Sequence, residues 1–351
     1  MTVKKRVKMI FNFLTNERLI HSLKTTFACL LGFAVTQSLG THPDPWLVIT
    51  VLVVMCAQIN VGSMIQKSYA RFLGTLSGSL IAALTIKFFG TDDFIFALVI
   101  GASALFFSYL ATGQSKFNDA GTLGAVTVTI ILIGQNPTLQ SAFNRFSEIS
   151  LGIVLAALVS QFILPVHARS HLRKSQAQTL RQLANYYRAT LLTDKKIENS
   201  ELDETIVKSL INQRKLSIDA AREPFGLSFN VGHFNQYLWY AREILRSIDF
   251  MHQTCVASVS CKNLFANTRI IKNFHDVICQ TLNEIAQGID DKNIQAHVIL
   301  IPNPQELKEI IATEKTALPA EDLVYVDAFL FCATILTSNL KKLFELVKEF
   351  Q

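Results

Sequence analysis

The chain has 351 residues and a formal net charge of +6, and half of its residues are hydrophobic, with a mean hydropathy of +0.31. Residues 1–165 hold 11 Lys or Arg against 6 Asp or Glu, so five of the six net charges lie in the first half. This composition argues against a soluble protein, and because the basic excess lies beside apolar runs it also argues against a nucleic-acid partner.

The first half of the chain contains six apolar segments, near 20–39, 44–60, 70–90, 93–112, 119–136 and 146–165. A helix needs about 20 apolar residues to cross a bilayer core, which these segments approach when their flanks are included. The second segment begins with Pro43 and Pro45, so we expect it to be short or tilted. The first run is long and no small-residue cleavage site follows it, which predicts that it is not a cleavable signal peptide.

The Lys and Arg residues between these segments predict their orientation. Basic residues precede the first segment, separate the second from the third and the fourth from the fifth, and follow the sixth, whereas the alternate loops are nearly free of them. By the positive-inside rule both termini are cytoplasmic. We therefore predict that residues 1–166 form a six-helix transmembrane domain with a basic cytosolic N-terminus, in the inner (plasma) membrane.

From His167 onward the pattern changes to amphipathic helices, predicted near 167–192, 200–222, 232–262, 264–288 and 321–350. Pro224 ends the second of them, and Pro302 and Pro304 mark a loop before the last. The last helix has one continuous apolar face, but Asp327 interrupts it, so we expect a packed cytosolic helix rather than a seventh span. The predicted fold is an all-α integral membrane protein in which six transmembrane helices are followed by a cytosolic helical bundle, residues 167–351.

The sequence contains no pattern typical of an enzyme or a metal site. It has no G-x-S-x-G, phosphate-binding loop or H-E-x-x-H motif, and its six cysteines form no C-x-x-C pair. His167 and His171 are spaced for one helix face, but the neighbouring Arg and Lys residues disfavour a bound cation. We expect no catalytic residues, no metal and no cofactor.

Cationic residues inside or beside the apolar segments are the candidates for a binding site. Lys24 lies one turn into the first segment, Arg71 near the start of the third, and Lys87 near the end of the third. A charge at bilayer depth costs at least about 2.5–3.5 kcal/mol on insertion scales, so it usually faces a cavity or a partner. Gly74 and Gly78 favour a close helix contact on the Arg71 side of that segment.

Two alternatives accompany this interpretation. Lys24 and Lys87 are near enough to an interface for their ammonium groups to reach lipid phosphates. Arg71 could instead be neutralised in a structural ion pair with Glu148 or Asp119.

Several stretches resemble the fusaric acid resistance (FUSC) family, which includes bacterial aromatic acid exporters and is related to the aluminium-activated malate transporters of plants. The resemblance rests on Trp46 with Ile49-Thr50-Val51, on Asn60 with Gly62, and on Arg71-x-x-Gly74-Thr75-x-x-Gly78. Residues 148–165 resemble the last membrane helix of the family, and Ala220-Ala-Arg-Glu-Pro224 is similar to a Glu-Pro motif of the malate transporters. The His-Gly that usually follows that motif is absent here.

The resemblance implies a six-helix unit with a cytosolic helical domain that moves organic anions, such as aromatic carboxylates, across the inner membrane. Arg71, Lys24, Lys87 and Asn60 are the expected substrate-binding residues, with membrane lipids as the other partner. Many family members carry two such units, and because this chain has one, we expect a homodimer.

The alternative function is a non-transporting membrane scaffold whose cytosolic helices bind a protein partner. A transport pathway requires the cationic side chains to turn to a common interior, whereas a scaffold leaves them pointing to the lipid headgroups.

Overall fold

The computed structural model describes residues 17–38, 45–56, 60–113, 118–134, 137–192, 196–223, 229–267, 269–297, 299–314 and 318–349. Within these ranges every regular element is helical. The chain divides into two compact units: Met1–Ala168 with Arg222–Gly226, and Arg169–Ala221 with Leu227–Gln351.

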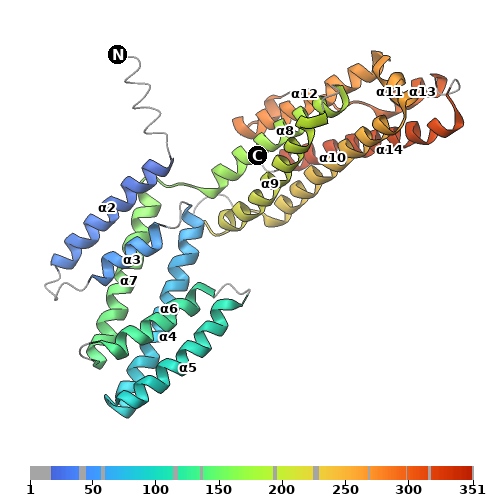
Figure 1. Ribbon diagram of the computed structural model, residues 1–351. Helices are drawn as coiled ribbons and strands as arrows, with labels where there is room; N and C mark the ends of the chain where they lie inside the picture. Colours follow the sequence, from blue (N-terminus) through green and yellow to red (C-terminus); the bar gives the residue numbers. More distant parts are fainter. Residues whose placement is uncertain are drawn as a thin grey trace. The chain divides into compact units, whose positions relative to one another are not determined.

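The described residues of the first unit form six helices (Figure 1): α2 (Glu17–Ser38), α3 (Trp46–Met55), α4 (Val61–Phe89), α5 (Asp93–Thr112), α6 (Asn118–Ile133) and α7 (Leu139–Phe162). Helices α2, α4, α5 and α7 are long and apolar enough to cross a membrane, whereas α3 and α6 are shorter apolar helices. The 10 residues of α3 rise only about 15 Å, half of a bilayer core. The structure thus agrees with the short second segment that the prolines predict, while the third segment begins earlier than expected, at Val61.

Local capping positions several of these helices. The side chain of Asp92 accepts hydrogen bonds from the backbone N–H groups of Phe94 and Ile95 and so begins α5. Thr138 and Ser141 form a reciprocal capping box at the start of α7. These polar residues mark the points at which α5 and α7 begin.

Helix α4 joins two apolar clusters. One, contributed by α2, α3, α4 and α7, includes Val51, Val54 and Ala156; the other, contributed by α4, α5, α6 and α7, includes Ala82 and Val128. Both clusters consist of side chains that are almost fully buried. The unit therefore has two adjoining cores that share α4 and α7.

Glycines bring these helices into close contact within the chain. A Cβ atom at Gly78 of α4 would lie 2.6 Å from the carbonyl oxygen of Gly124 on α6, and one at Gly74 would lie 2.6 Å from that of Ala120. Gly152 of α7 packs in the same way against α3. The close helix contact that Gly74 and Gly78 favour thus forms inside this chain, with α6.

The second unit contains α8 (Ala168–Leu192), α9 (Lys196–Ala221), α10 (Val231–Ala257), α11 (Val259–Asn267), α12 (Arg269–Asp291), a 3-10 turn η1 (Ile294–Ala296), α13 (Pro304–Glu314) and α14 (Ala320–Glu349) (Figure 1). The helix predicted over 232–262 is divided at Ser258, and Pro304 begins α13 where the sequence predicts a loop. A proline suits the first position of a helix because the N–H it lacks has no intrahelical partner there.

Helix α14 is long and apolar enough to span a membrane by length and composition. Its apolar positions, among them Leu330, Leu336 and Leu343, are buried along one face that packs mainly on α10. This continuous face is the one that the three- and four-residue spacing predicts.

Candidate functional site

Arg71 is buried in the first unit, with 5% of its surface exposed. It lies ten residues after the start of α4, about 15 Å along the helix axis. Its Nε and Nη2 atoms donate hydrogen bonds to the hydroxyl oxygen of Thr50 on α3, at 3.3 and 3.2 Å. Thr50 itself is fully buried, so the guanidinium is held against α3 in the interior of the helices.

The position of Thr50 is fixed by α7. Gly152 has no side chain, and a Cβ atom added there would lie 2.7 Å from the carbonyl oxygen of Leu47 and 2.8 Å from Cβ of Thr50. Helix α7 can therefore approach the backbone of α3 at the level of Thr50 only because residue 152 is glycine.

Lys24 is a second buried cation, with 2% of its surface exposed. Its Nζ atom extends from α2 to α7, where it donates to the carbonyl oxygen of Ser160 at 3.5 Å and to the hydroxyl oxygen of Ser160 at 3.4 Å. The side chain thus turns into the unit and does not snorkel towards an interface.

The partners of both cations are neutral oxygen atoms. Among the described residues, neither Arg71 nor Lys24 has a carboxylate within ion-pair distance. Arg71 forms no ion pair with Glu148 or Asp119, and Asp119 is exposed at the start of α6. Within the described residues, the hydrogen-bond partners of both buried cations are therefore neutral.

Lys87 and Asn60 are not brought to these two cations. Lys87 is exposed in the last turn of α4, where its Nζ atom lies 5.9 Å from the ring centre of Phe88. Asn60 occupies the N-cap position of α4, but its side chain makes no capping hydrogen bond. The two residues lie at opposite ends of α4, which has 29 residues, so the four predicted site residues do not form one cluster.

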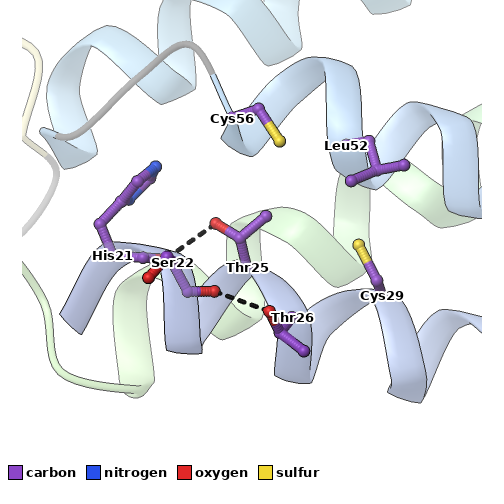
Figure 2. Close-up of a pocket in the computed structure, with 7 residues that line it drawn as sticks. All are labelled: His21, Ser22, Thr25, Thr26, Cys29, Leu52 and Cys56. Carbon is purple, nitrogen blue, oxygen red and sulfur yellow. Dashed lines mark hydrogen bonds between the residues drawn. The ribbon is translucent and has the colours of Figure 1, made fainter. Parts of the chain in front are cut away.

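A cavity of about 420 Å³ lies between α2 and α3, lined by His21, Ser22, Thr25, Thr26, Cys29, Leu52 and Cys56. Figure 2 shows that the hydroxyl groups of Thr25 and Thr26 are engaged by their own helix; they donate to the carbonyl oxygens of His21 and Ser22. Lys24 does not line this cavity. Sequence reasoning missed it because no charge marks its lining.

Residues 222 and 223 belong to the first unit, although the segments before and after residues 222–226 belong to the second. The carboxylate of Glu223 accepts a hydrogen bond from the backbone N–H of Ala168, and its other oxygen lies 3.6 Å from Nδ1 of His167. Arg222 donates to the side chain of Gln66 on α4. Near these contacts the backbone N–H of Val61 donates to the carbonyl oxygen of Val166 at 3.2 Å. The start of the helix that carries Arg71 is thus tied to residues more than 100 positions away.

A comparison with protein families places these features in context. The model of the fusaric acid resistance protein family matches residues 18–240, more than half of the chain. The chain belongs to this family. The match covers all four predicted site residues and extends through Glu223 into α10. With several helices long and apolar enough to cross a membrane, this member of the family is a multi-pass membrane protein.

Curated relatives match over part of their length. The inner membrane protein YeeA of Escherichia coli (strain K12) is 25% identical over 210 residues, which are 59% of this chain and 58% of that protein. The aluminum-activated malate transporter 12 of Arabidopsis thaliana is 26% identical over 60% of this chain and 40% of that protein. The multidrug resistance protein MdtO of E. coli (strain K12) is 26% identical over 50% of this chain and 26% of that protein. The chain thus covers less than two thirds of the length of each relative.

Proposed function

We propose that this protein moves organic carboxylate anions, aromatic ones included, across the inner membrane, and that Lys24 and Arg71 bind the carboxylate on its way. The observation that carries the proposal is the burial of two cations whose partners in the described residues are hydroxyl and carbonyl oxygens. Neutral oxygens solvate a cation without cancelling its charge. Each site therefore keeps an electrostatic preference for an anion.

Burial makes this preference strong. The attraction between opposite charges grows as the effective dielectric falls, and both side chains are almost completely removed from solvent. A guanidinium can hold a carboxylate through two parallel hydrogen bonds, whereas an ammonium acts as a point charge. A carboxylate that moves past both residues would be attracted by the point charge of Lys24 and oriented by two hydrogen bonds from Arg71.

The relatives support the chemical class. One is named as a malate transporter and another as a multidrug resistance protein, so transport of small organic molecules is the common theme of these names. The proposed arrangement has six membrane-embedded helices, α2 to α7, with both termini and the second unit in the cytoplasm.

The function is tested by flux through proteoliposomes that contain the purified full chain. We expect flux of benzoate, 4-hydroxybenzoate or malate driven by a concentration gradient, and no flux of uncharged benzamide. Lys24→Gln and Arg71→Gln should each lower carboxylate flux at least about tenfold, which corresponds to about 1.4 kcal/mol in the barrier. Lys87→Gln is the matched control, because it removes an exposed cation from the same helix as Arg71 and should leave the flux near the wild-type value.

A protein that inserts normally but moves none of these carboxylates would refute the transport proposal and favour the scaffold alternative. Equal losses in Lys24→Gln, Arg71→Gln and Lys87→Gln would refute the two-site assignment, since the exposed Lys87 would then matter as much as the buried pair.

We also propose that the active form is a homodimer, because many members of the family carry two six-helix units and the sequence contains one copy of the Arg-x-x-Gly-Thr pattern. The mass of the protein in nanodiscs should then be twice that of the protomer. A monomer that retains full flux would contradict this.

A further inference from the structure

The contacts of helix α7 give the separation of the two buried cations along its axis. Lys24 binds Ser160, and the Thr50 partner of Arg71 lies against Gly152. Residues 152 and 160 are eight positions apart on one continuous helix, which corresponds to about 12 Å along its axis. The cations therefore lie at two different depths of the same helical unit and do not form a single binding site.

The contacts of α2 and α3 give the same order. A Cβ atom at Gly32 would lie 2.9 Å from the side chain of Leu47, so this part of α2 lies beside the start of α3, near Thr50. Lys24 lies eight residues, about two turns, before Gly32 on α2. The Lys24 site is consequently displaced from the Arg71 site towards the end of α3 that contains Met55.

An apolar layer fills the space between the two sites. We define it by Ala28, Val51, Val54 and Ala156, which are all fully buried and belong to one cluster. Ala28 lies one turn from Lys24, Val54 one turn from Thr50, and Ala156 one turn from both Gly152 and Ser160. These four residues come from three helices, α2, α3 and α7, and all four are apolar.

We infer that a transported carboxylate occupies the Lys24 site and the Arg71 site in turn, and that the apolar layer is the barrier between them. This inference rests on the proposed function. A dry layer of aliphatic side chains offers an anion neither water nor hydrogen-bond donors, so it blocks the path until the helices part or water enters. A short dicarboxylate such as malate cannot reach both cations at once across this layer, so each carboxylate group is bound singly.

The test changes the polarity and the packing of the layer without touching either cation. Val54→Ser introduces a hydroxyl group into the layer and should raise benzoate flux about tenfold, equivalent to a barrier lower by about 1.4 kcal/mol. Ala156→Leu adds volume to the closed layer and should lower the flux about tenfold. The matched controls are Val128→Ser and Ala82→Leu, which make the same changes at fully buried positions of the other cluster, away from both cations.

Flux is expressed per inserted protein, with thermal stability measured for all four variants, so that loss of folding is separated from loss of transport. Opposite effects of Val54→Ser and Ala156→Leu, with little change in the two controls, support the barrier. If the layer variants change flux no more than their controls do, the barrier is refuted while the proposed function stands. If the wild-type protein moves no carboxylate, the proposed function itself fails.

Discussion

Arg71 and Thr50 form the central contact of the candidate site: two nitrogen atoms of one guanidinium donate to a single hydroxyl oxygen, at 3.3 and 3.2 Å. The contact joins α4 to α3 across 21 positions of sequence. A hydroxyl group orients the guanidinium but cannot neutralise it, so the positive charge remains available to an anion.

Substitution of Thr50 tests this orienting role. Thr50→Val keeps the shape of the side chain but removes the acceptor, and a buried donor left without its partner costs about 1–3 kcal/mol. We expect lower thermal stability and lower carboxylate flux. Thr50→Ser keeps the hydroxyl group and should recover most of both quantities. A wild-type Thr50→Val together with a defective Thr50→Ser would mean that packing of the threonine methyl, and not its hydrogen bond, matters at this position.

The absence of an Arg71–Glu148 contact yields a prediction from a double variant. Arg71→Ala should abolish most of the flux, and Arg71→Lys should retain the charge but transport less well, because lysine lacks the planar fork. Since Arg71 forms no ion pair with Glu148 in the described part of the chain, Glu148→Gln should not restore transport to Arg71→Ala. Full recovery in the double variant, measured by flux and by abundance in the membrane, would show that Arg71 serves only as a structural partner.

The contact of α7 with α3 predicts a strong effect of a single methyl group. Gly152→Ala would place Cβ 2.7 Å from the carbonyl oxygen of Leu47, so α7 must move away from α3. We expect destabilisation by about 1–3 kcal/mol, the range for overpacked cores, and a loss of flux because Thr50 shifts. Gly101→Ala is the control, since a Cβ atom there meets no other atom within 4 Å. In detergent, Gly101→Ala should have an unfolding temperature at or above that of the wild type. An unchanged unfolding temperature in Gly152→Ala would contradict the close contact.

A buried histidine predicts how the stability of the second unit depends on pH. Nδ1 of His275 lies 2.6 Å from the hydroxyl oxygen of the buried Tyr187, and burial lowers the pKa of His275 to about 4. Between this value and the unfolded pKa of about 6.5, the unfolded chain binds a proton that the folded chain does not, so stability falls as the pH falls. The loss from this group at pH 5 is about 2 kcal/mol.

The free energy of unfolding of His275→Gln should therefore differ less between pH 7 and pH 5 than that of the wild type. Unfolding is followed by circular dichroism in detergent. Glutamine keeps an acceptor for Tyr187 and does not titrate. An unchanged pH dependence in His275→Gln would assign the acid sensitivity to other groups.

The proposed topology predicts which loops face the outside. Thr91 lies in the short connection between α4 and α5, and Ser115 lies between α5 and α6, outside the described residues. In a background in which the six native cysteines are replaced, a cysteine at Thr91 should react with an impermeant maleimide in intact cells, whereas one at Ser115 should react only after permeabilisation. The reverse pattern would invert the orientation predicted from the basic loops.

Local signals in the sequence determined much of the secondary structure of this protein. Apolar runs and their lengths predicted the helices of the first unit, and the amphipathic spacing predicted the buried face of α14, because hydrophobic periodicity is a property of neighbouring residues. The same reading singled out Lys24, Arg71 and Lys87 as cations inside or beside the apolar segments, and the Arg71 stretch indicated the family. The errors occurred where local signals compete: Pro304 reads as a loop residue but also suits the first position of a helix, as it does in α13.

Only the tertiary structure decided which of these residues belong together. The choice of Thr50 as the partner of Arg71, and not a carboxylate, depends on a close approach of α7 and α3 that Gly152 permits. The turn of Lys24 towards Ser160 depends on a helix 136 positions away. Glu223 reaches Ala168 only because the chain returns to its first unit. Such contacts join segments whose separation in sequence carries no periodic signal, so they are fixed by packing alone.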